Sequence, residues 1–328
     1  MTAIGTYVPD KKLTNFDLEK IVETNDEWIV SRTGIKERRM SQENEFTSDL
    51  CISAVKDLMY RYNKNIEDVD MILVATSTPD FSFPSVSSII QNELNIHKTG
   101  AIDISAACAG FVYALHTAHA YITSGQHDKI LVIGADTLSK ITDYTDRSTC
   151  ILFGDGAGAV LIEKEEQSDS FLGFDLGSDG SQAHNVYRTG ISNKVNDIEL
   201  VDSQLLVQNG REVFRWVVRN IPESIKRISQ KTQIHLNDID WFIPHSANLR
   251  MIEPLCEKLD YPIEKTLYSL EKFGNTSAAS IPLALDLGIR KGMVKNEDKV
   301  LMHGFGSGLV YAGQLLKLNF DKQINFSY

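Results

Sequence analysis

Two segments of the chain recur 170 residues downstream, in the same order and with the same spacing. The apolar run at 70–74 returns at 240–244, and the run at 128–134 returns at 298–304. Two strand-like segments in one register indicate two copies of one folding unit. We therefore expect two halves, residues 1–165 and 166–328, that together form one duplicated fold.

The two halves differ at matched positions that carry reactive side chains. Cys108 in the first half has an alanine opposite it in the second. His245 and Asn275 in the second half have an alanine and a serine opposite them in the first. A thiol, an imidazole and a carboxamide, each present in one copy only, are the candidates for chemistry.

Composition and charge exclude several classes of protein. Hydrophobic residues at 42% and charged residues at 23% are typical of a globular protein. A net charge of −11 argues against nucleic acid as a partner. Apolar runs of about seven residues are much shorter than the roughly 20 that cross a bilayer, and we expect no membrane association. Four scattered cysteines predict a reducing, cytoplasmic setting without disulfides, metal or cofactor.

Short apolar runs alternate with amphipathic stretches, which is the pattern of an α/β protein. Nearly continuous hydrophobicity in the runs predicts sheets covered on both faces. The expected strands are 71–75, 101–104, 130–134, 159–162, 241–244, 300–302 and 309–316, and the expected helices are 48–62, 109–124, 210–229, 247–259 and 277–291. About 18 extra residues follow Gly134 in the first half, and we expect a binding loop at 135–149.

The local sequence around each candidate residue predicts a strand followed by a helix. A thiol such as Cys108 at a helix N-terminus has its pKa lowered from about 8.5 by the helix dipole. His245 ends a strand, and Asn275 lies at the matching turn of the second half. The glycine-rich segments 154–158 and 304–308 lack the Lys-Ser/Thr of a phosphate loop. We interpret them as tight turns close to the site.

The chain resembles β-ketoacyl-acyl-carrier-protein synthase III, the initiating condensing enzyme of fatty-acid synthesis in the thiolase superfamily. The matching motifs lie at 26–34, 106–110, 145–147, 153–158, 245–250 and 274–277. Elongating synthases of the superfamily use Cys-His-His, whereas this chain has Asn275 in the third position. The resemblance implies an α/β, five-layered α-β-α-β-α thiolase-like fold and a homodimer.

The resemblance also implies roles for the three candidate residues. Cys108 would hold the acyl primer as a thioester, taken from acyl-CoA. His245 and Asn275 would hydrogen-bond the thioester carbonyl of malonyl-acyl-carrier protein and stabilise the enolate that forms as carbon dioxide leaves. A second oxyanion hole would use the backbone N–H groups of Cys108 and Ser307, although the family commonly has glycine at the latter position.

The substrate-binding residues are implied in the same way. Trp28 and Arg147 would enclose the CoA adenine, with Arg32 and Thr33 nearby, and Asn248 would contact the pantetheine arm. Phe83 would cross the dimer interface and bound the primer pocket. The residues that would dock the acidic carrier protein are Ser246, Ala247, Asn248, Leu249, Arg250, Arg211 and Arg215, the last two forming a helix stripe with Arg219.

Two alternatives stay open at this stage. One is a related synthase that hands the acyl group to another nucleophile, as in polyketide formation. The other is a non-condensing CoA-binding or acyl-binding protein, against which the intact Cys-His-Asn set argues. The primer is not fixed by the sequence, because one methylene changes pocket affinity by only ~1–3 kcal/mol. Similarity to Gram-positive relatives favours acceptance of branched primers.

Overall fold

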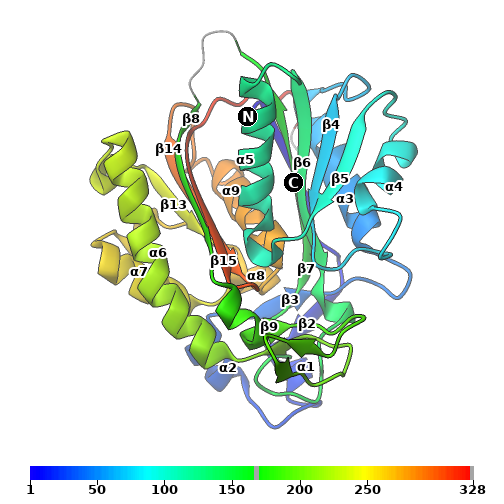
Figure 1. Cartoon of the computed structure of the whole chain (residues 1–328), viewed down its shortest axis with the longest axis vertical. Helices are drawn as coiled ribbons and strands as arrows, with labels where there is room; N and C mark the ends of the chain where they lie inside the picture. The colour runs from blue at the N-terminus through cyan, green and yellow to red at the C-terminus, as the bar shows by residue number, and fades with distance from the viewer. Residues whose placement is uncertain (166–169, 326–328) are drawn as a thin grey trace.

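Two β-sheets form the framework of the computed structural model, which describes residues 1–165 and 170–325 (Figure 1). The first sheet has the strand order β1-β7-β6-β4-β5, and the second has the order β13-β14-β15-β8. The strands of the first sheet are β1 (Ala3–Tyr7), β4 (Met71–Ala75), β5 (Gly100–Ile104), β6 (Lys129–Thr137) and β7 (Asp155–Glu163). Those of the second are β8 (Phe171–Ser178), β13 (Trp241–Pro244), β14 (Lys299–Gly306) and β15 (Val310–Lys317).

The predicted repeat reappears in the pairing of these strands. In the first sheet β4 and β6 are parallel, with Met71 opposite Ile130. In the second sheet β13 and β14 are parallel, with Trp241 opposite Val300. Each of these partners lies 170 residues after its counterpart, so the duplicated fold is confirmed. The predicted boundary between residues 165 and 166 borders the segment 166–169, which lies outside the described residues.

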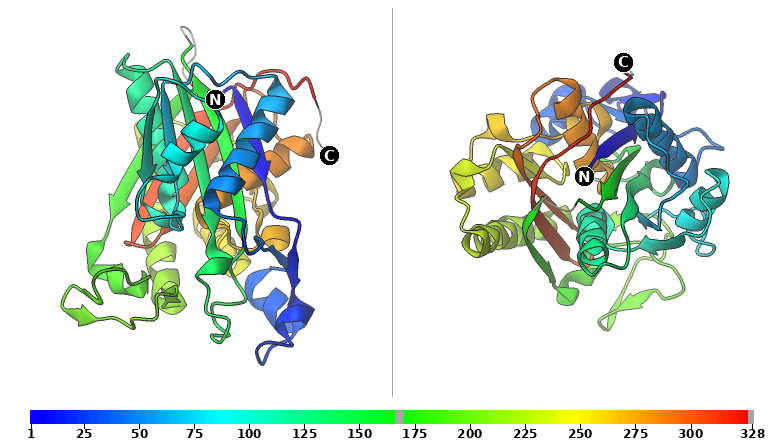
Figure 2. Two further views of the ribbon diagram at one scale, coloured as in Figure 1. Left: turned by 90° about the vertical axis from the view of Figure 1, so that its right-hand side faces the viewer. Right: turned by 90° about the horizontal axis from the view of Figure 1, so that it is seen from above.

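Helices lie between the sheets and on both outer faces. Helices α5 (Gly110–Thr123) and α9 (Ser280–Arg290) lie between the sheets and contact strands of both. Helices α3 (Thr47–Tyr62) and α4 (Val86–Glu93) cover the first sheet, and α6 (Gly210–Thr232) and α7 (Leu249–Leu259) cover the second. Seen from above, the two outer pairs lie on opposite sides of the molecule (Figure 2). The five-layered α-β-α-β-α architecture is confirmed.

Shorter elements gather at one end of the sheets (Figure 1). Helix α2 carries Trp28 and begins after Asn25, whose side chain accepts a hydrogen bond from the Trp28 N–H. These elements are β2 (Lys12–Thr14), β3 (Glu37–Arg39), α1 (Asn15–Leu18), α2 (Asp26–Thr33), β9 (Val186–Tyr187), β10 (Lys194–Val195), β11 (Ile198–Glu199), β12 (Val207–Gln208) and α8 (Leu270–Phe273).

Two predictions of local structure were wrong. The segment 154–158 is not a tight turn, because Gly156 and Gly158 lie inside strand β7. A Cβ on Gly158 would lie 2.5 Å from the Cβ of Pro282 in α9, so glycine is needed for close packing of helix on sheet. In the second glycine-rich segment β14 extends through Gly306, and the turn predicted at 304–308 lies at 307–309. The helix expected from residue 247 begins two residues later, at Leu249.

One glycine on each parallel core strand contacts the turn that belongs to the other half. Gly134 of β6 packs on the turn η6 (Ser277–Ala279), where an added Cβ would lie 2.5 Å from the Ala278 carbonyl oxygen. Gly304 of β14 packs on η1 (Ala107–Ala109), where a Cβ would lie 2.7 Å from Ala109 Cα. These two glycines are again 170 residues apart, so each half brings its turn against the other.

The two halves also share their hydrophobic cores. Buried side chains from both sheets, such as Leu73 and Met302, belong to one cluster, and a second cluster joins α2 to α6. Each half therefore depends on the other for burial of apolar surface. Within 1–165 and 170–325, we find no helix of the length and hydrophobicity that a membrane span requires.

We predict that Gly134→Ala lowers the free energy of unfolding by about 1–3 kcal/mol, because the methyl group overlaps the Ala278 carbonyl oxygen. Urea unfolding followed by circular dichroism measures the change. Gly180→Ala is the matched control, because no heavy atom lies within 4 Å of its added Cβ. Equal stability of the two variants would contradict the proposed contact between the halves.

Candidate active site

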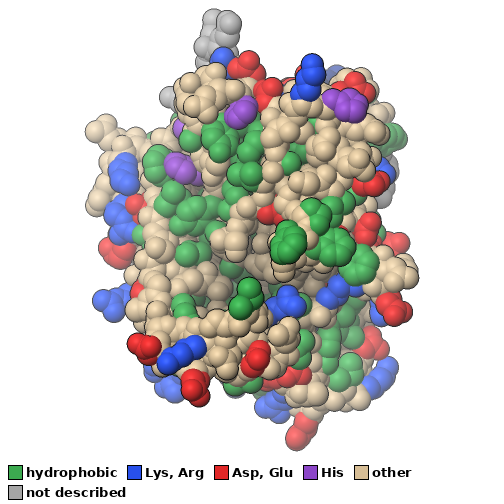
Figure 3. Space-filling model, turned by 45° about the vertical axis from the view of Figure 1, so that its right-hand side comes forward, with side chains coloured by type: hydrophobic (Ala, Val, Ile, Leu, Met, Phe, Trp, Pro, Cys, Tyr) green, Lys and Arg blue, Asp and Glu red, His purple; other side chains and the backbone are tan. Residues whose placement is uncertain are grey.

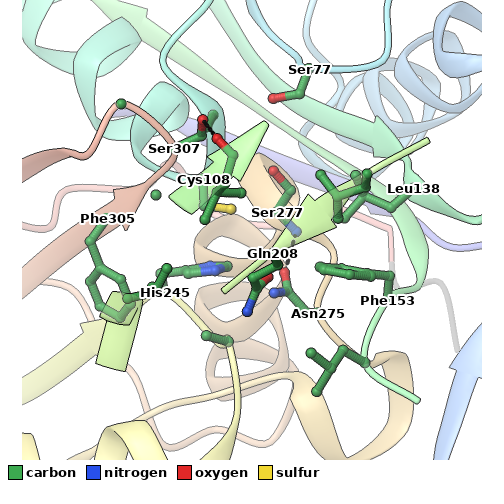
Figure 4. A pocket seen from close by; sticks show the side chains of 18 of the residues that line it. Ser77, Cys108, Leu138, Phe153, Gln208, His245, Asn275, Ser277, Phe305 and Ser307 are labelled. Atoms are coloured by element: carbon green, nitrogen blue, oxygen red, sulfur yellow. Dashed lines mark hydrogen bonds between the residues drawn. The ribbon is translucent and has the colours of Figure 1, made fainter. Parts of the chain in front are cut away.

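Cys108, His245 and Asn275 line one cavity of about 410 Å³ between the two halves (Figure 4). Cys108 comes from the first half, and the other two residues come from the second. The cavity wall is mainly apolar and includes Leu138, Phe153 and Phe305. Strand pairing and the two glycine contacts therefore bring together side chains that are far apart in the sequence.

Cys108 lies in the short turn η1, which connects β5 to α5. Burial raises the pKa of its thiol to about 12, and a hydrogen bond with Ser277 opposes this effect only in part. The prediction that the helix terminus lowers this pKa was therefore wrong for the free protein. The thiol is neutral at physiological pH and has to lose its proton as it reacts.

His245 directly follows β13, and its backbone N–H donates to the carbonyl of His303 on β14 at 2.8 Å. The ring is almost fully buried, and burial lowers its pKa to about 3. His245 is therefore neutral at physiological pH. Nδ1 lies 2.7 Å from the hydroxyl oxygen of Ser280, and the ring points into the cavity near Asn275 (Figure 4).

Asn275 is held by backbone hydrogen bonds to the first half. Its N–H donates to the carbonyl of Leu152 at 2.8 Å, and its carbonyl accepts from the N–H of Gly154 at 3.0 Å. The side-chain oxygen accepts the backbone N–H of Ser277 at 2.9 Å. Because Oδ1 has this partner, the Nδ2 group is available to donate a hydrogen bond to a ligand.

The backbone at the end of β14 lies close to Cys108. A Cβ built on Gly306 would lie 2.8 Å from the backbone nitrogen of Cys108, so these two backbones are in close contact. The next residue, Ser307, lines the cavity, and its hydroxyl donates to the carbonyl of Val186 at 2.6 Å. Ser307 has no left-handed φ, so a side chain fits where the family commonly has glycine.

Three of the residues predicted to bind CoA, Trp28, Arg32 and Arg147, meet beside α2. The guanidinium carbon of Arg147, from the predicted binding loop, lies 4.8 Å from the Trp28 ring centroid, and that of Arg32 lies 5.9 Å away. Thr33 is different, because it is buried and its hydroxyl donates to the Ile29 carbonyl at 2.7 Å. Its side chain therefore stabilises the end of α2 rather than facing a ligand.

The segment predicted to dock a carrier protein is only partly accessible. Ser246 is fully buried and its hydroxyl accepts the N–H of Ser269, and Ala247 is buried as well, so neither side chain reaches the surface. Arg250 is exposed and donates to the carbonyl of Ser31 at 3.1 Å. The remaining members of the predicted surface are Asn248 and Leu249, half-buried, and Arg211 and Arg215, exposed on α6.

One arginine of the stripe on α6 is paired with an acid, since Arg215 lies 2.6 Å from Glu212.

Phe83 is 87% exposed and does not line the Cys108 cavity of its own chain. In the described ranges, no group of three or more histidine, cysteine or acidic side chains is arranged to hold a metal ion.

Some residues that shape the site were not singled out from the sequence. Ser280 contacts the His245 ring from 35 residues away, and the buried carboxylate of Asp136 accepts the backbone N–H of Ala278 at 3.3 Å. Periodicity carries no signal for such contacts, because they depend on how the two halves pack. Ala107 and Ser277, at matched positions of the two halves, also have positive φ values (46° and 50°), which their residue types do not predict.

Comparison with known proteins decides the family. The model of 3-oxoacyl-[acyl-carrier-protein (ACP)] synthase III matches residues 102–180, and the model of its C-terminal part matches 229–318. A beta-ketoacyl-[acyl-carrier-protein] synthase III 2 from Halalkalibacterium halodurans is 59% identical over 97% of this chain and 96% of its own length. The chain belongs to the β-ketoacyl-acyl-carrier-protein synthase III family.

Other relatives support the assignment of this chain to the synthase III family. The corresponding synthase III 2 of Bacillus subtilis is 55% identical over 97% of this chain and 98% of its own. The crystal structure of synthase III from Thermus thermophilus has a TM-score of 0.93 and 42% identity, covering 97% of this chain and 98% of that one. The thiolase-like fold and the acyl-transferring class of the enzyme follow.

We predict that alkylation of Cys108 by iodoacetamide accelerates about tenfold for each pH unit between pH 6 and 9. The thiol pKa of about 12 lies above this range, so the thiolate fraction rises continuously with pH. Intact mass spectrometry follows the reaction, with Cys108→Ala as the control for the three other cysteines. A rate that levels off near pH 7 would contradict the raised pKa.

Proposed function

We propose that the synthase condenses an acyl-CoA primer with malonyl-acyl-carrier protein, with loss of carbon dioxide, and so begins fatty-acid synthesis. One observation carries the proposal: a thiol and two neutral side chains suited to donating hydrogen bonds face the same largely apolar cavity. A thiol provides the acyl attachment point, and paired donors stabilise an oxyanion.

In the first step Cys108 takes the acyl group from CoA. The sulfur of Cys108 forms a bond to the thioester carbonyl carbon, and the bond from that carbon to the CoA sulfur breaks. The proton of the Cys108 thiol passes to the departing CoA sulfur, which leaves as the free thiol. The backbone N–H groups of Cys108 and Ser307 are the proposed donors to the oxyanion of the tetrahedral intermediate.

In the second step malonyl-acyl-carrier protein enters the same cavity. The bond to the carboxylate breaks, carbon dioxide leaves, and the electron pair remains as an enolate. His245 and Asn275 donate hydrogen bonds to the enolate oxygen, and each donor stabilises the transition state by about 3 kcal/mol in a dry site. The enolate carbon then forms a bond to the acyl-Cys108 carbonyl carbon, and the bond from that carbon to the Cys108 sulfur breaks. The released thiolate takes up a proton from water.

The surface near α2 supports binding of CoA. The contact between Arg147 and Trp28, at 4.8 Å, leaves no room for a third ring, so an adenine enters only if the arginine side chain moves outward. Asn248 lines the cavity that contains Cys108, and we propose that a pantetheine arm passes beside it. A reducing cytoplasm suits the four cysteines, none of which forms a disulfide.

A basic surface supports docking of an acidic carrier protein. Arg211, Arg215 and Arg219 are spaced four residues apart and are all exposed on α6. Arg250, in the first turn of α7, is exposed as well, and it contacts α2. In a chain of net charge −11, such a surface directs an acidic partner toward the cavity.

We also propose that the synthase is a homodimer joined along β5. This strand is the edge of the first sheet, and among the described residues it pairs with β4 alone. Ile102 on β5 and the nearby Phe81 and Phe83 are 40%, 58% and 87% exposed. Hydrophobic side chains gather on the face of the molecule that carries β5 (Figure 3). Such a surface fits a second copy, whose Phe83 would then bound the primer pocket.

We expect acetyl-CoA or isobutyryl-CoA to add one acyl group to the protein, as measured by intact mass. Cys108→Ala should gain no mass. Asn275→Ala should still be acylated, because its amide acts only on the enolate, but should lose at least about 100-fold in condensation. If no primer adds mass to the native protein, the proposed acyl-transfer step is wrong.

The dimer proposal is tested by Phe83→Asp. A charge in a buried interface is strongly unfavourable, so this variant should sediment as a monomer in analytical ultracentrifugation. Phe16→Asp is the control, because Phe16 is 62% exposed on α1, away from β5. Identical sedimentation of native protein and both variants would contradict the interface.

A further inference from the structure

Ser280, the first residue of α9, lies directly behind the His245 ring. Its hydroxyl oxygen is 2.7 Å from His245 Nδ1 and 3.3 Å from the backbone nitrogen of Ser246. Ser280 is fully buried and does not line the cavity, so it touches no substrate. Its own carbonyl accepts the hydroxyl of Ser269 at 3.1 Å, which fixes the start of α9 next to the histidine.

The hydrogen-bond partners of this hydroxyl determine where its proton lies. The Ser246 N–H can only donate, so it uses one lone pair of the Ser280 oxygen. Among the described residues, the remaining partner of the hydroxyl is His245 Nδ1. If Nδ1 carried a proton, the buried hydroxyl hydrogen would have no acceptor among those residues, which is unfavourable. The favoured arrangement is therefore Ser280 O–H donating to Nδ1.

The protonation state of His245 completes the argument. Burial lowers the pKa of this ring to about 3, so the ring carries a single proton at physiological pH. When Nδ1 accepts a hydrogen bond, that proton is on Nε2. We propose that Ser280 is a positioning residue that holds His245 in the tautomer whose Nε2–H donates into the cavity.

This inference deepens the proposed function and rests on it for its catalytic consequence. A proton on Nε2 lets His245 bind the enolate oxygen, whereas the other tautomer would direct a lone pair at that negative charge. The hydroxyl should therefore matter for condensation, where charge develops on the enolate oxygen. It should matter little for transfer of the acyl group to Cys108, whose oxyanion has the proposed backbone donors.

The tautomer can be measured directly, without any activity. Long-range proton–nitrogen correlation spectra of histidine-labelled protein distinguish protonated from unprotonated ring nitrogens, and His245→Gln identifies the signals among the eight histidines. We expect Nε2 to be protonated and Nδ1 to be an unprotonated acceptor. A proton on Nδ1 would overturn the proposal, whether or not the protein condenses any substrate.

Kinetics then test the role of the hydroxyl. Ser280→Ala should lower kcat for condensation about fivefold to tenfold, as expected for loss of one hydrogen bond to the ring, and leave acylation of Cys108 within about twofold. Ser280→Thr keeps a hydroxyl and should restore condensation. If acylation falls together with condensation, Ser280 serves only to support the fold and the proposal fails.

The chain contains a matched control for these variants. His303, on the strand next to His245, is also fully buried with a pKa lowered to about 3 by burial, and its Nε2 lies 3.0 Å from the hydroxyl of Ser224. Neither residue lines the cavity. Ser224→Ala should leave both half-reactions unchanged. An equal loss of condensation in Ser224→Ala and Ser280→Ala would overturn the specific role of Ser280.

The two proposals fail in different ways. If no acyl-CoA modifies Cys108, the proposed function is wrong, but the spectrum of the native protein still decides the tautomer. If the native protein condenses substrates and Nδ1 is protonated, the function stands and the role of Ser280 is wrong. Should Ser280→Ala not fold, the native spectrum remains decisive.

Discussion

Close contact between the two halves, made possible by one glycine on each parallel core strand, is the constraint on which the site depends. The turn that follows Asn275 packs against Gly134, and the turn that contains Cys108 packs against Gly304. A side chain at either position would separate a turn from the opposite sheet. Because Cys108 comes from one half and His245 and Asn275 come from the other, that separation would also separate the three proposed catalytic residues. Stability and chemistry therefore depend on the same contacts.

The sequence predicts most of this framework because the duplication is visible in its apolar runs. The 170-residue offset makes β13 the equivalent of β4, and it places Cys108 and Asn275 at equivalent turns and His245 directly after β13. Local interpretation failed where tertiary packing decides the outcome. Gly156 and Gly158 were predicted to form a turn but lie in strand β7. Glycine is present there because α9 packs too closely on the strand to leave room for a side chain. Ser246 looked accessible but is fully buried.

The buried, largely apolar site explains the electrostatics of the trio. Burial keeps both the Cys108 thiol and the His245 ring neutral at physiological pH. Neutral donors bind a neutral thioester weakly and an enolate strongly, so their stabilisation is largest in the transition state. Their orientation is set by partners outside the cavity wall or beside it: Ser277 occupies the Asn275 oxygen, and Ser280 contacts His245 Nδ1. In the proposed mechanism His245 therefore does not have to change its protonation state before the enolate forms.

The measurement that tests the central proposal most directly is the mass of the carrier protein after reaction. Native protein is first acylated with isobutyryl-CoA, freed of excess primer, and mixed with malonyl-acyl-carrier protein. We predict that the carrier gains the isobutyryl group and loses carbon dioxide, while the acyl mass on Cys108 disappears at the same rate. A carrier that stays malonylated, or that becomes acetylated while Cys108 keeps its acyl group, would contradict condensation at this site.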